Sequence, residues 1–231
     1  MKKIRVLLVD DHEVVRSGLR RLLELNGDIE VVVEADSGER AYLICKDTEF
    51  DVIVMDLSMP GIGGLEALRR IVQKDPKAKV VVFTMHENTA SATQALSAGA
   101  RSYVIKSGPA DNLVTAVREA SAGIGYISSS ISQKIVLQDI SGEYDPIKSL
   151  STREFEVFRM LAEGFHIDSI AYNLNISHKT VANYQSSLKQ KLGISSAVEL
   201  VRLAIQSGVI AKIKPNIELI STSPLYVHGK N

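Results

Sequence analysis

The chain has 231 residues, enough for one large domain or for two domains of ordinary size. Apolar residues make up 45% of it and charged residues 23%, as in a soluble globular protein, and the formal net charge is zero. The overall charge argues against a general affinity for polyanions, but residues 148–214 hold nine Lys and Arg against five Asp and Glu. This mildly basic segment is a weak sign of nucleic-acid binding.

Cysteine content and hydropathy exclude two further classes of protein. The single cysteine, Cys45, cannot form a disulfide framework within one chain, and its place in a helical pattern is typical of a buried reduced thiol. No segment reaches the length of a transmembrane helix, and the N-terminus lacks a signal peptide. We therefore expect a cytoplasmic protein that does not associate with membranes.

Short apolar runs alternate with helix-period segments through the first 124 residues. The expected strands are rich in Val and Ile and cover Ile4–Val9, Ile29–Glu34, Val52–Met55, Lys79–Thr84 and Ser102–Ile105. The expected helices cover Glu13–Leu25, Glu39–Lys46, Gly64–Lys74, Thr89–Ser97 and Ala110–Ala122. Runs without polar alternation indicate strands buried on both faces of a parallel sheet. Five βα units in succession predict a flavodoxin-like α/β domain over residues 1–124.

A linker and a purely helical segment follow this domain. Residues 125–147 predict a linker with room for one short helix, because Gly142, Asp145 and Pro146 break the periodic pattern. From there the period is helical, and Ser151-Thr-Arg-Glu154 has the spacing of a capping box. We expect an all-α domain over residues 148–212, with helices near 152–163, 167–174, 178–191 and 196–206, followed by a tail over 213–231.

Polar side chains of the first domain gather at the ends of its strands. Asp10 and Asp11 follow the first strand, Asp56 follows the third, Thr84 ends the fourth and Lys106 follows the fifth. The carboxyl ends of parallel strands share one edge, where open α/β sheets bind ligands. The second strand contributes no such residue, which fits the strand order 2-1-3-4-5. Each residue alone also fits a helix cap, a strand-end hydroxyl or a surface charge, but together they favour a common site.

The residue types at this edge indicate phosphoryl chemistry. Three carboxylates repel one another unless a cation joins them, and an oxygen-only set of ligands suits a hard divalent ion such as Mg²⁺. A free carboxylate, a hydroxyl and a lysine are the groups that phosphoryl transfer to an aspartate requires. The metal and the ammonium group neutralise charge on the phosphoryl oxygens, while positioning supplies much of the remaining catalysis.

Residues 4–122 resemble the receiver domain of two-component response regulators, on Val9-Asp10-Asp11, Asp56-Leu-Ser-Met-Pro60 with Gly64, Thr84 and Lys106. The resemblance implies that a sensor histidine kinase phosphorylates Asp56. It implies that Mg²⁺ is bound by Asp11, Asp56 and the main-chain carbonyl of Ser58, with Asp10 acting partly through water. It further implies that Tyr103 is a switch aromatic, which turns inward as Thr84 moves toward the phosphoryl group. An ordinary strand aromatic remains the alternative for Tyr103.

The segment after Thr84 departs from the commonest pattern of these domains. Met85 stands where many relatives carry a small residue, and its bulk is expected to narrow access to the phosphorylated site. His86 comes next. For this residue a partly exposed loop histidine is favoured over a catalytic one.

The second domain contains the pattern helix, short turn, helix. Ile167–Leu174 forms the first helix, and the second runs through Leu192 with three lysines and no acidic residue. Val181, Leu188 and Leu192 recur at helical spacing and should face the core. The amide and hydroxyl side chains on the other faces suit phosphate and base-edge contacts in a DNA major groove. A plain helical bundle with one basic face is the alternative that the pattern alone leaves open.

Residues 148–210 resemble the helix-turn-helix domain of the LuxR/NarL/FixJ class, on Leu150-Ser-Thr-Arg-Glu154, Leu161-Ala-Glu-Gly164, Lys179-Thr180-Val181 and Lys191-Leu192-Gly193. The resemblance implies a four-helix domain and sequence-specific binding to double-stranded DNA. The expected DNA contacts are Lys179, Thr180, Asn183, Tyr184, Ser186, Ser187 and Lys191. Ala182 and Tyr184 replace residues that are often basic or histidine in relatives, so this helix is less basic than usual.

The two domains together predict a transcription regulator rather than an enzyme. Phosphorylation of Asp56 is expected to change homodimerisation and thereby DNA binding, with two half-sites bound by a dimer. An aspartate-nucleophile phosphatase is disfavoured because Ser58 stands where such enzymes usually carry a general-acid aspartate. A phosphorylation-independent regulator is disfavoured by the intact set of strand-end residues.

Overall fold

The computed structural model describes residues 2–141 and 146–210. The first part of the chain is a parallel sheet in the order β2-β1-β3-β4-β5, which confirms the predicted order. Its strands are Ile4–Val9 (β1), Ile29–Ala35 (β2), Val52–Met55 (β3), Val80–Thr84 (β4) and Ser102–Ile105 (β5). The helices that alternate with them are Glu13–Glu24 (α1), Gly38–Asp47 (α2), Gly63–Lys74 (α3), Thr89–Ser97 (α4) and Asp111–Ser121 (α5).

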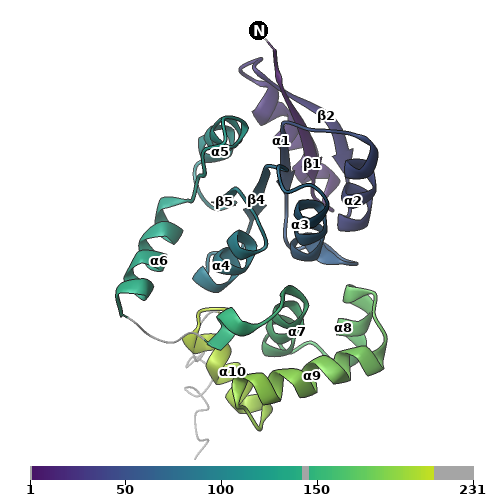
Figure 1. Cartoon of the computed structure of the whole chain (residues 1–231), viewed down its shortest axis with the longest axis vertical. Coiled ribbons are helices and arrows are strands. Elements are labelled where there is room, and N and C mark those ends of the chain that lie inside the picture. Colours follow the sequence, from purple (N-terminus) through teal and green to yellow (C-terminus); the bar gives the residue numbers. More distant parts are fainter. Residues whose placement is uncertain (1, 142–145, 211–231) are drawn as a thin grey trace, which may run out of the picture.

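The sheet is buried on both faces, as its continuous apolar runs predict. Along β1, Val6 and Leu8 face a core that α1 and α5 cover, while Leu7 and Val9 face α2, α3 and α4. Every residue of β3 and β4 is buried. The result is the flavodoxin-like, doubly wound α/β fold expected from the five βα units (Figure 1).

The segment after α5 adds to the edge of this sheet. The amide of Tyr103 donates to the carbonyl of Tyr126 at 2.8 Å, and the amide of Ser128 donates to the carbonyl of Tyr103 at 3.0 Å. The helix that follows, Ser129–Ser141 (α6), is longer than the short helix expected there, and its Ile131 is fully buried. The start of the predicted linker therefore packs on the first domain. Residues 142–145 of that linker and the predicted tail 213–231 lie outside the described residues.

The second part of the chain is helical. It consists of a short 3-10 helix, Pro146–Ser149 (η1), and the helices Thr152–Ala162 (α7), Ile167–Leu174 (α8), His178–Leu192 (α9) and Ala197–Gln206 (α10). The predicted capping box is present, since Ser151 and Glu154 each accept from the other's backbone amide. Asn175, in the left-handed region at φ 50°, makes the turn from α8 to α9. Val181 and Leu188 are fully buried, as their spacing predicts.

The helical domain lies against α3 and α4 of the sheet domain (Figure 1). The amide of Gly61 donates to the carbonyl of Asn173 at 2.7 Å, and Arg153 Nη1 donates to the carbonyl of Ile62 at 2.9 Å. One cluster of buried apolar side chains runs through both domains and includes Ile62 and Phe155. No helix within residues 2–141 and 146–210 is long and apolar enough to cross a membrane.

Candidate functional site

The carboxyl edge of the sheet brings together three of the predicted residues in one hydrogen-bonded group. Lys106 Nζ donates to Asp10 Oδ2 and to Asp56 Oδ2, each at 2.7 Å. Both carboxylates are almost completely buried. Burial by itself would lower the pKa of Lys106, but its hydrogen bonds to Asp10 and Asp56 and their negative charge outweigh burial and raise the pKa above its usual value. The lysine is therefore held charged between two acids.

Asp11 lies beside this group with unsatisfied hydrogen-bonding capacity. Its Oδ1 is buried and has no hydrogen-bond partner among the described residues, although His12 Nδ1 lies 3.0 Å away without hydrogen-bond geometry. A buried carboxylate oxygen without a partner is costly unless a cation occupies the space next to it. Asp10, Asp11 and His12 bring their ligand atoms within 4.8 Å of one another. This acidic cluster is compatible with Mg²⁺.

The start of α3 lies very close to the main chain of Asp56, and this close approach depends on a glycine. Gly64 is the second residue of α3, and its amide donates to the carbonyl of Leu57 at 3.1 Å. A Cβ at Gly64 would overlap with the carbonyl oxygen of Asp56. Only glycine therefore allows α3 to start so close to the end of β3.

Thr84 and Tyr103 meet at the main chain of His86. Thr84 is fully buried and its Oγ1 accepts from the amide of His86 at 3.4 Å. The Tyr103 ring is also fully buried and points inward, with its hydroxyl donating to the carbonyl of His86 at 2.8 Å. Burial, with the charge of Asp56, raises the pKa of Tyr103 well above its usual value. The phenol therefore stays protonated and available as a donor.

His86 is half-buried in the loop after β4, in agreement with the partly exposed loop histidine expected there. Its Nε2 lies 2.9 Å from Ser58 Oγ, while the Ser58 amide donates to Asp56 Oδ1 at 3.2 Å. Burial lowers the pKa of His86 to about 4, with a further contribution from the charge of Arg159. Met85 is 63% exposed, and the expectation that its bulk narrows access to Asp56 stays a prediction.

The predicted DNA-contact residues on α9 fall into two groups. Lys179, Asn183 and Ser186 are exposed to solvent, and Thr180 and Tyr184 are half-buried. The hydroxyl of Ser186 donates back to the carbonyl of Ala182, and Thr180 Oγ1 lies 2.8 Å from Ser177 Oγ at the start of the helix. The remaining pair, Ser187 and Lys191, contacts the same domain instead.

Glu154 of the capping box holds that remaining pair. Ser187 Oγ donates to Glu154 Oε1 at 2.7 Å, and Lys191 Nζ donates to Glu154 Oε2 at 2.8 Å. Burial alone would raise the pKa of Glu154, but its hydrogen bonds to Lys191, Ser187 and Ser151 lower it to about 2. These two side chains therefore fasten α9 to α7, a role that their spacing on α9 gave no means of predicting.

Comparison with known proteins agrees with the architecture of both the sheet domain and the helical domain. Residues 6–118 match the response regulator receiver domain, and residues 148–204 match the bacterial regulatory proteins of the luxR family. The response regulator UvrY of Escherichia coli K12 is 42% identical over 208 residues, which cover 89% of this chain and 95% of UvrY. The response regulator GacA of Pseudomonas aeruginosa is 39% identical over 209 residues, covering 90% of this chain and 98% of GacA. The chain belongs to the response regulators.

Solved structures extend the agreement to the whole regulator. RcsB from Salmonella typhimurium is 30% identical, covers 90% of this chain and 99% of its own, and superposes with a TM-score of 0.69. RcsB from Salmonella enterica serovar Typhimurium bound to a promoter in the presence of the phosphomimetic BeF3⁻ is 29% identical, with a TM-score of 0.66 and coverage of 87% and 98%. This response regulator thus combines a receiver domain with a LuxR-type helix-turn-helix domain and regulates transcription.

Proposed function

We propose that Asp56 is the phosphoacceptor of this response regulator. The observation that carries the proposal is the pair of 2.7 Å hydrogen bonds from Lys106 to Asp10 and Asp56. They place a permanent positive charge where phosphoryl oxygens would accumulate negative charge, in a buried setting where electrostatic stabilisation is strongest. The donor protein is a sensor histidine kinase, the partner that a receiver domain implies.

Mg²⁺ is the proposed cofactor of this transfer. Asp11, Asp56 and the carbonyl of Ser58 would hold it, with Asp10 acting partly through water. The buried Asp11 Oδ1, which has no hydrogen-bond partner within residues 2–141 and 146–210, supports this assignment. When bound, the ion supplies charge neutralisation for the phosphoryl group. The chain's own residues orient the Asp56 carboxylate, since the Ser58 amide donates to its Oδ1 and Lys106 Nζ donates to its Oδ2.

Thr84 and Tyr103 are the proposed switch residues. The supporting observation is that both side chains bond to the main chain of His86. Thr84 Oγ1 accepts from the His86 amide, and the Tyr103 hydroxyl donates to the His86 carbonyl. Thr84 Oγ1 accepts from the His86 amide, so its hydroxyl hydrogen can donate to a phosphoryl oxygen, and a turn of the side chain toward that oxygen would break the contact with the amide. The loop between β4 and α4 would then shift, and Tyr103 would shift with it.

The output is proposed to be DNA binding by a homodimer through α9. Lys179, Thr180, Asn183, Tyr184 and Ser186 are the proposed contacts that reach solvent or lie near it. Ser187 and Lys191 would act as positioning contacts, because Glu154 already holds them. RcsB is seen as two dimers bound to two parallel DNAs, which supports a dimer on double-stranded DNA. Such a regulator acts in the cytoplasm.

The proposed domain boundaries are 1–124 for the receiver, 125–147 for the linker and 148–212 for the DNA-binding domain. A signalling role is favoured over a phosphatase, because Ser58 occupies the position of a phosphatase general acid and has no carboxyl group to protonate a leaving group.

The test is phosphoryl incorporation and DNA footprinting with acetyl phosphate and Mg²⁺. Wild type should incorporate one phosphoryl group and gain affinity for its operator, whereas Asp56→Asn should do neither. Asp51, the residue before β3, accepts from the main-chain amide of Arg5 and lies outside the hydrogen-bonded group of Lys106, so Asp51→Asn is the matched control and should behave as wild type. Incorporation into Asp56→Asn at the wild-type level would refute the assignment.

A further inference from the structure

The two acids that follow β1 are held through their main chain as well as through their side chains. The amide of Asp10 donates to the carbonyl of Ala35 at the end of β2, at 3.2 Å. The carbonyl of Asp10 accepts from Arg16 Nη1 at 2.7 Å. This carbonyl belongs to the planar peptide unit that joins Asp10 to Asp11, so its orientation fixes the direction in which Asp11 leaves the strand. Arg16 therefore acts on the geometry of both acids, which we call the Asp10-Asp11 segment.

Arg16 reaches this segment from the start of α1. It is the fourth residue of the helix, and its amide donates to the carbonyl of the N-cap residue His12 at 3.0 Å. Side chains on a helix lean toward its N-terminus, so an arginine at this position points back to the end of β1. The side chain is only 14% exposed, which is low for an arginine and shows that it is packed rather than solvated.

Glu34, on β2, binds the other edge of the Arg16 guanidinium group. Arg16 Nε donates to Glu34 Oε2 at 3.3 Å, and Arg20 Nε donates to Glu34 Oε1 at 2.6 Å. The hydrogen bond from Arg20, with a smaller contribution from Arg16, outweighs burial and lowers the pKa of Glu34 below its usual value. The ionised carboxylate thus connects β2 to α1, and Arg16 connects α1 to the main chain of Asp10. Although β2 places no side chain in the site, it contributes to the site through Glu34.

Asp11 is the acid that depends most on its main chain. The side chain of Asp10 is held on both sides, since Oδ1 accepts from the amide of His12 at 2.8 Å and Oδ2 accepts from Lys106. Asp11 Oδ1 is buried and accepts no hydrogen bond from residues 2–141 and 146–210. A carboxylate that is oriented before a cation arrives does not pay the cost of ordering when the cation binds. Support of the peptide before Asp11 should therefore appear as metal affinity.

We propose that Arg16 is a positioning residue of the phosphorylation site, which raises the affinity for the divalent cation by holding the Asp10-Asp11 segment, and that Glu34 acts through Arg16. The inference rests on the proposed Mg²⁺ site. Arg16 is not itself a ligand, because a guanidinium group has no lone pair to offer a cation. Hydrogen-bond partners behind the ligands of a metal typically change its affinity by about 10–100-fold.

The first experiment measures the binding of a metal ion alone to the full chain, without a phosphodonor. Mn²⁺ takes the same oxygen ligands as Mg²⁺, and electron paramagnetic resonance reports the Mn²⁺ that stays free. Arg16→Ala should bind a single Mn²⁺ as wild type does, with a dissociation constant about tenfold higher. Arg16→Lys keeps a charged donor on a long side chain and should restore most of the affinity. Competition with Mg²⁺ should give the same ratios.

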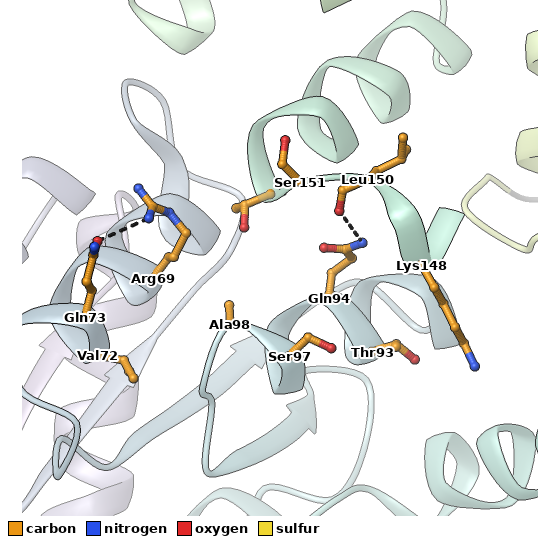
Figure 2. A pocket seen from close by; sticks show the side chains of 11 residues that line it. Arg69, Val72, Gln73, Thr93, Gln94, Ser97, Ala98, Lys148, Leu150 and Ser151 are labelled. Carbon is orange, nitrogen blue, oxygen red and sulfur yellow. Dashed lines mark hydrogen bonds between the residues drawn. The ribbon is translucent and has the colours of Figure 1, made fainter. Parts of the chain in front are cut away.

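Arg69, on α3, supplies the matched control. Like Arg16 it bonds a carboxylate, that of Glu66, and its Nη1 donates to Gln73 at 3.2 Å (Figure 2). Both of these partners belong to α3. Arg69→Ala therefore removes an arginine and its ion pair without touching the Asp10-Asp11 segment, and its dissociation constant for Mn²⁺ should equal that of wild type.

Glu34→Gln tests the connection to β2. The amide keeps an acceptor for Arg16 but loses the negative charge, so the dissociation constant for Mn²⁺ should rise by about threefold. In the Arg16→Ala background the same substitution should have no further effect, because Glu34 acts on the Asp10-Asp11 segment only through Arg16. An equal effect of Glu34→Gln in both backgrounds would overturn this part of the proposal.

The second experiment measures phosphorylation by acetyl phosphate as a function of Mg²⁺ concentration. For Arg16→Ala the half-saturating Mg²⁺ concentration should rise by about tenfold, while the maximal rate at saturating Mg²⁺ stays within about twofold of wild type. General damage to the fold would give a different result. A partly unfolded sample would bind less than one Mn²⁺ per chain at unchanged affinity and would lose maximal rate.

A wild-type dissociation constant for Mn²⁺ in Arg16→Ala would overturn the role of the arginine, and so would an equal increase in Arg69→Ala. If Arg16→Ala does not fold, Glu34→Gln decides in its place, and a wild-type constant there overturns the proposal. The proposed Mg²⁺ site fails separately, if Asp11→Asn binds Mn²⁺ as tightly as wild type.

Discussion

Glu156 is a buried carboxylic acid at the contact between the domains, and it should make the stability of the chain depend on pH. It is 6% exposed on α7, and a Cβ built on Gly63 of the receiver would lie 2.6 Å from its Oε1. Burial raises its pKa to about 7, and the nearby charge of Glu66 adds to this, while Arg153 and Arg159 oppose it. Arg153 Nη1 donates to its Oε2 at 2.6 Å.

The sign and size of the effect follow from linkage. The folded chain holds the proton of Glu156 up to about pH 7, whereas an exposed glutamate loses it near 4.5. The unfolded state thus binds fewer protons between these values, and the free energy of unfolding must fall as pH rises through this window. At about 1.4 kcal/mol per pH unit, the loss amounts to about 3 kcal/mol and is complete above about pH 8.

The measurement is urea unfolding between pH 4.5 and 8.5 at constant ionic strength. Relative to Glu156→Gln, wild type should lose about 3 kcal/mol of unfolding free energy across this range, since the amide has no proton to release. Glu163→Gln, an exposed carboxylate at the end of the same helix, is the control and should keep the wild-type pH dependence. If the unfolding free energies of wild type and Glu156→Gln changed with pH in parallel, burial of this acid at the interface would not be the cause of a pH-dependent stability.

Three further predictions concern the receiver, the helical core and the DNA contact. Gly64→Ala should destabilise the receiver by more than about 3 kcal/mol in urea unfolding, because its Cβ overlaps the Asp56 carbonyl oxygen; a wild-type midpoint would contradict this. Glu154→Ala should cost about 2 kcal/mol by thermal unfolding at pH 7, and the difference from wild type should shrink as pH falls from 4.5 toward 2, where Glu154 is protonated. Lys179→Ala should reduce the slope of log affinity against log salt by about 1 in DNA titrations, whereas an unchanged slope would remove Lys179 from the phosphate contacts.

Local sequence patterns determined the fold of each domain and the composition of its site. Continuous apolar runs such as Val80–Phe83 specify strands buried on both faces, and parallel strands bring their carboxyl ends to one edge. Asp10, Asp56 and Lys106 therefore had to meet, and the structure joins them within hydrogen-bond distance. The capping box at Ser151 was equally predictable, because its spacing alone places each side chain on the other's amide.

Tertiary structure decided how residues from different elements are used. Ser187 and Lys191 have the chemistry of DNA contacts, but α7 places Glu154 where it binds both of them. Residues after α5 looked like a linker by composition, yet the main chain of Tyr103 left an edge to which they could pair. In each case the deciding partner is distant in the chain.

The roles of Glu156 and Arg159 come from the docking of one domain on the other. On α7 they have the spacing of any charged helical residues, and periodicity within a helix carries no information about which surface will cover it. The receiver buries Glu156 and raises its pKa, and the same docking places Arg159 beside a cavity that Asp11 and Ser58 also line. Sequence thus determined what the site is made of, and the packing of the two domains decided which residues of α7 line the cavity beside it.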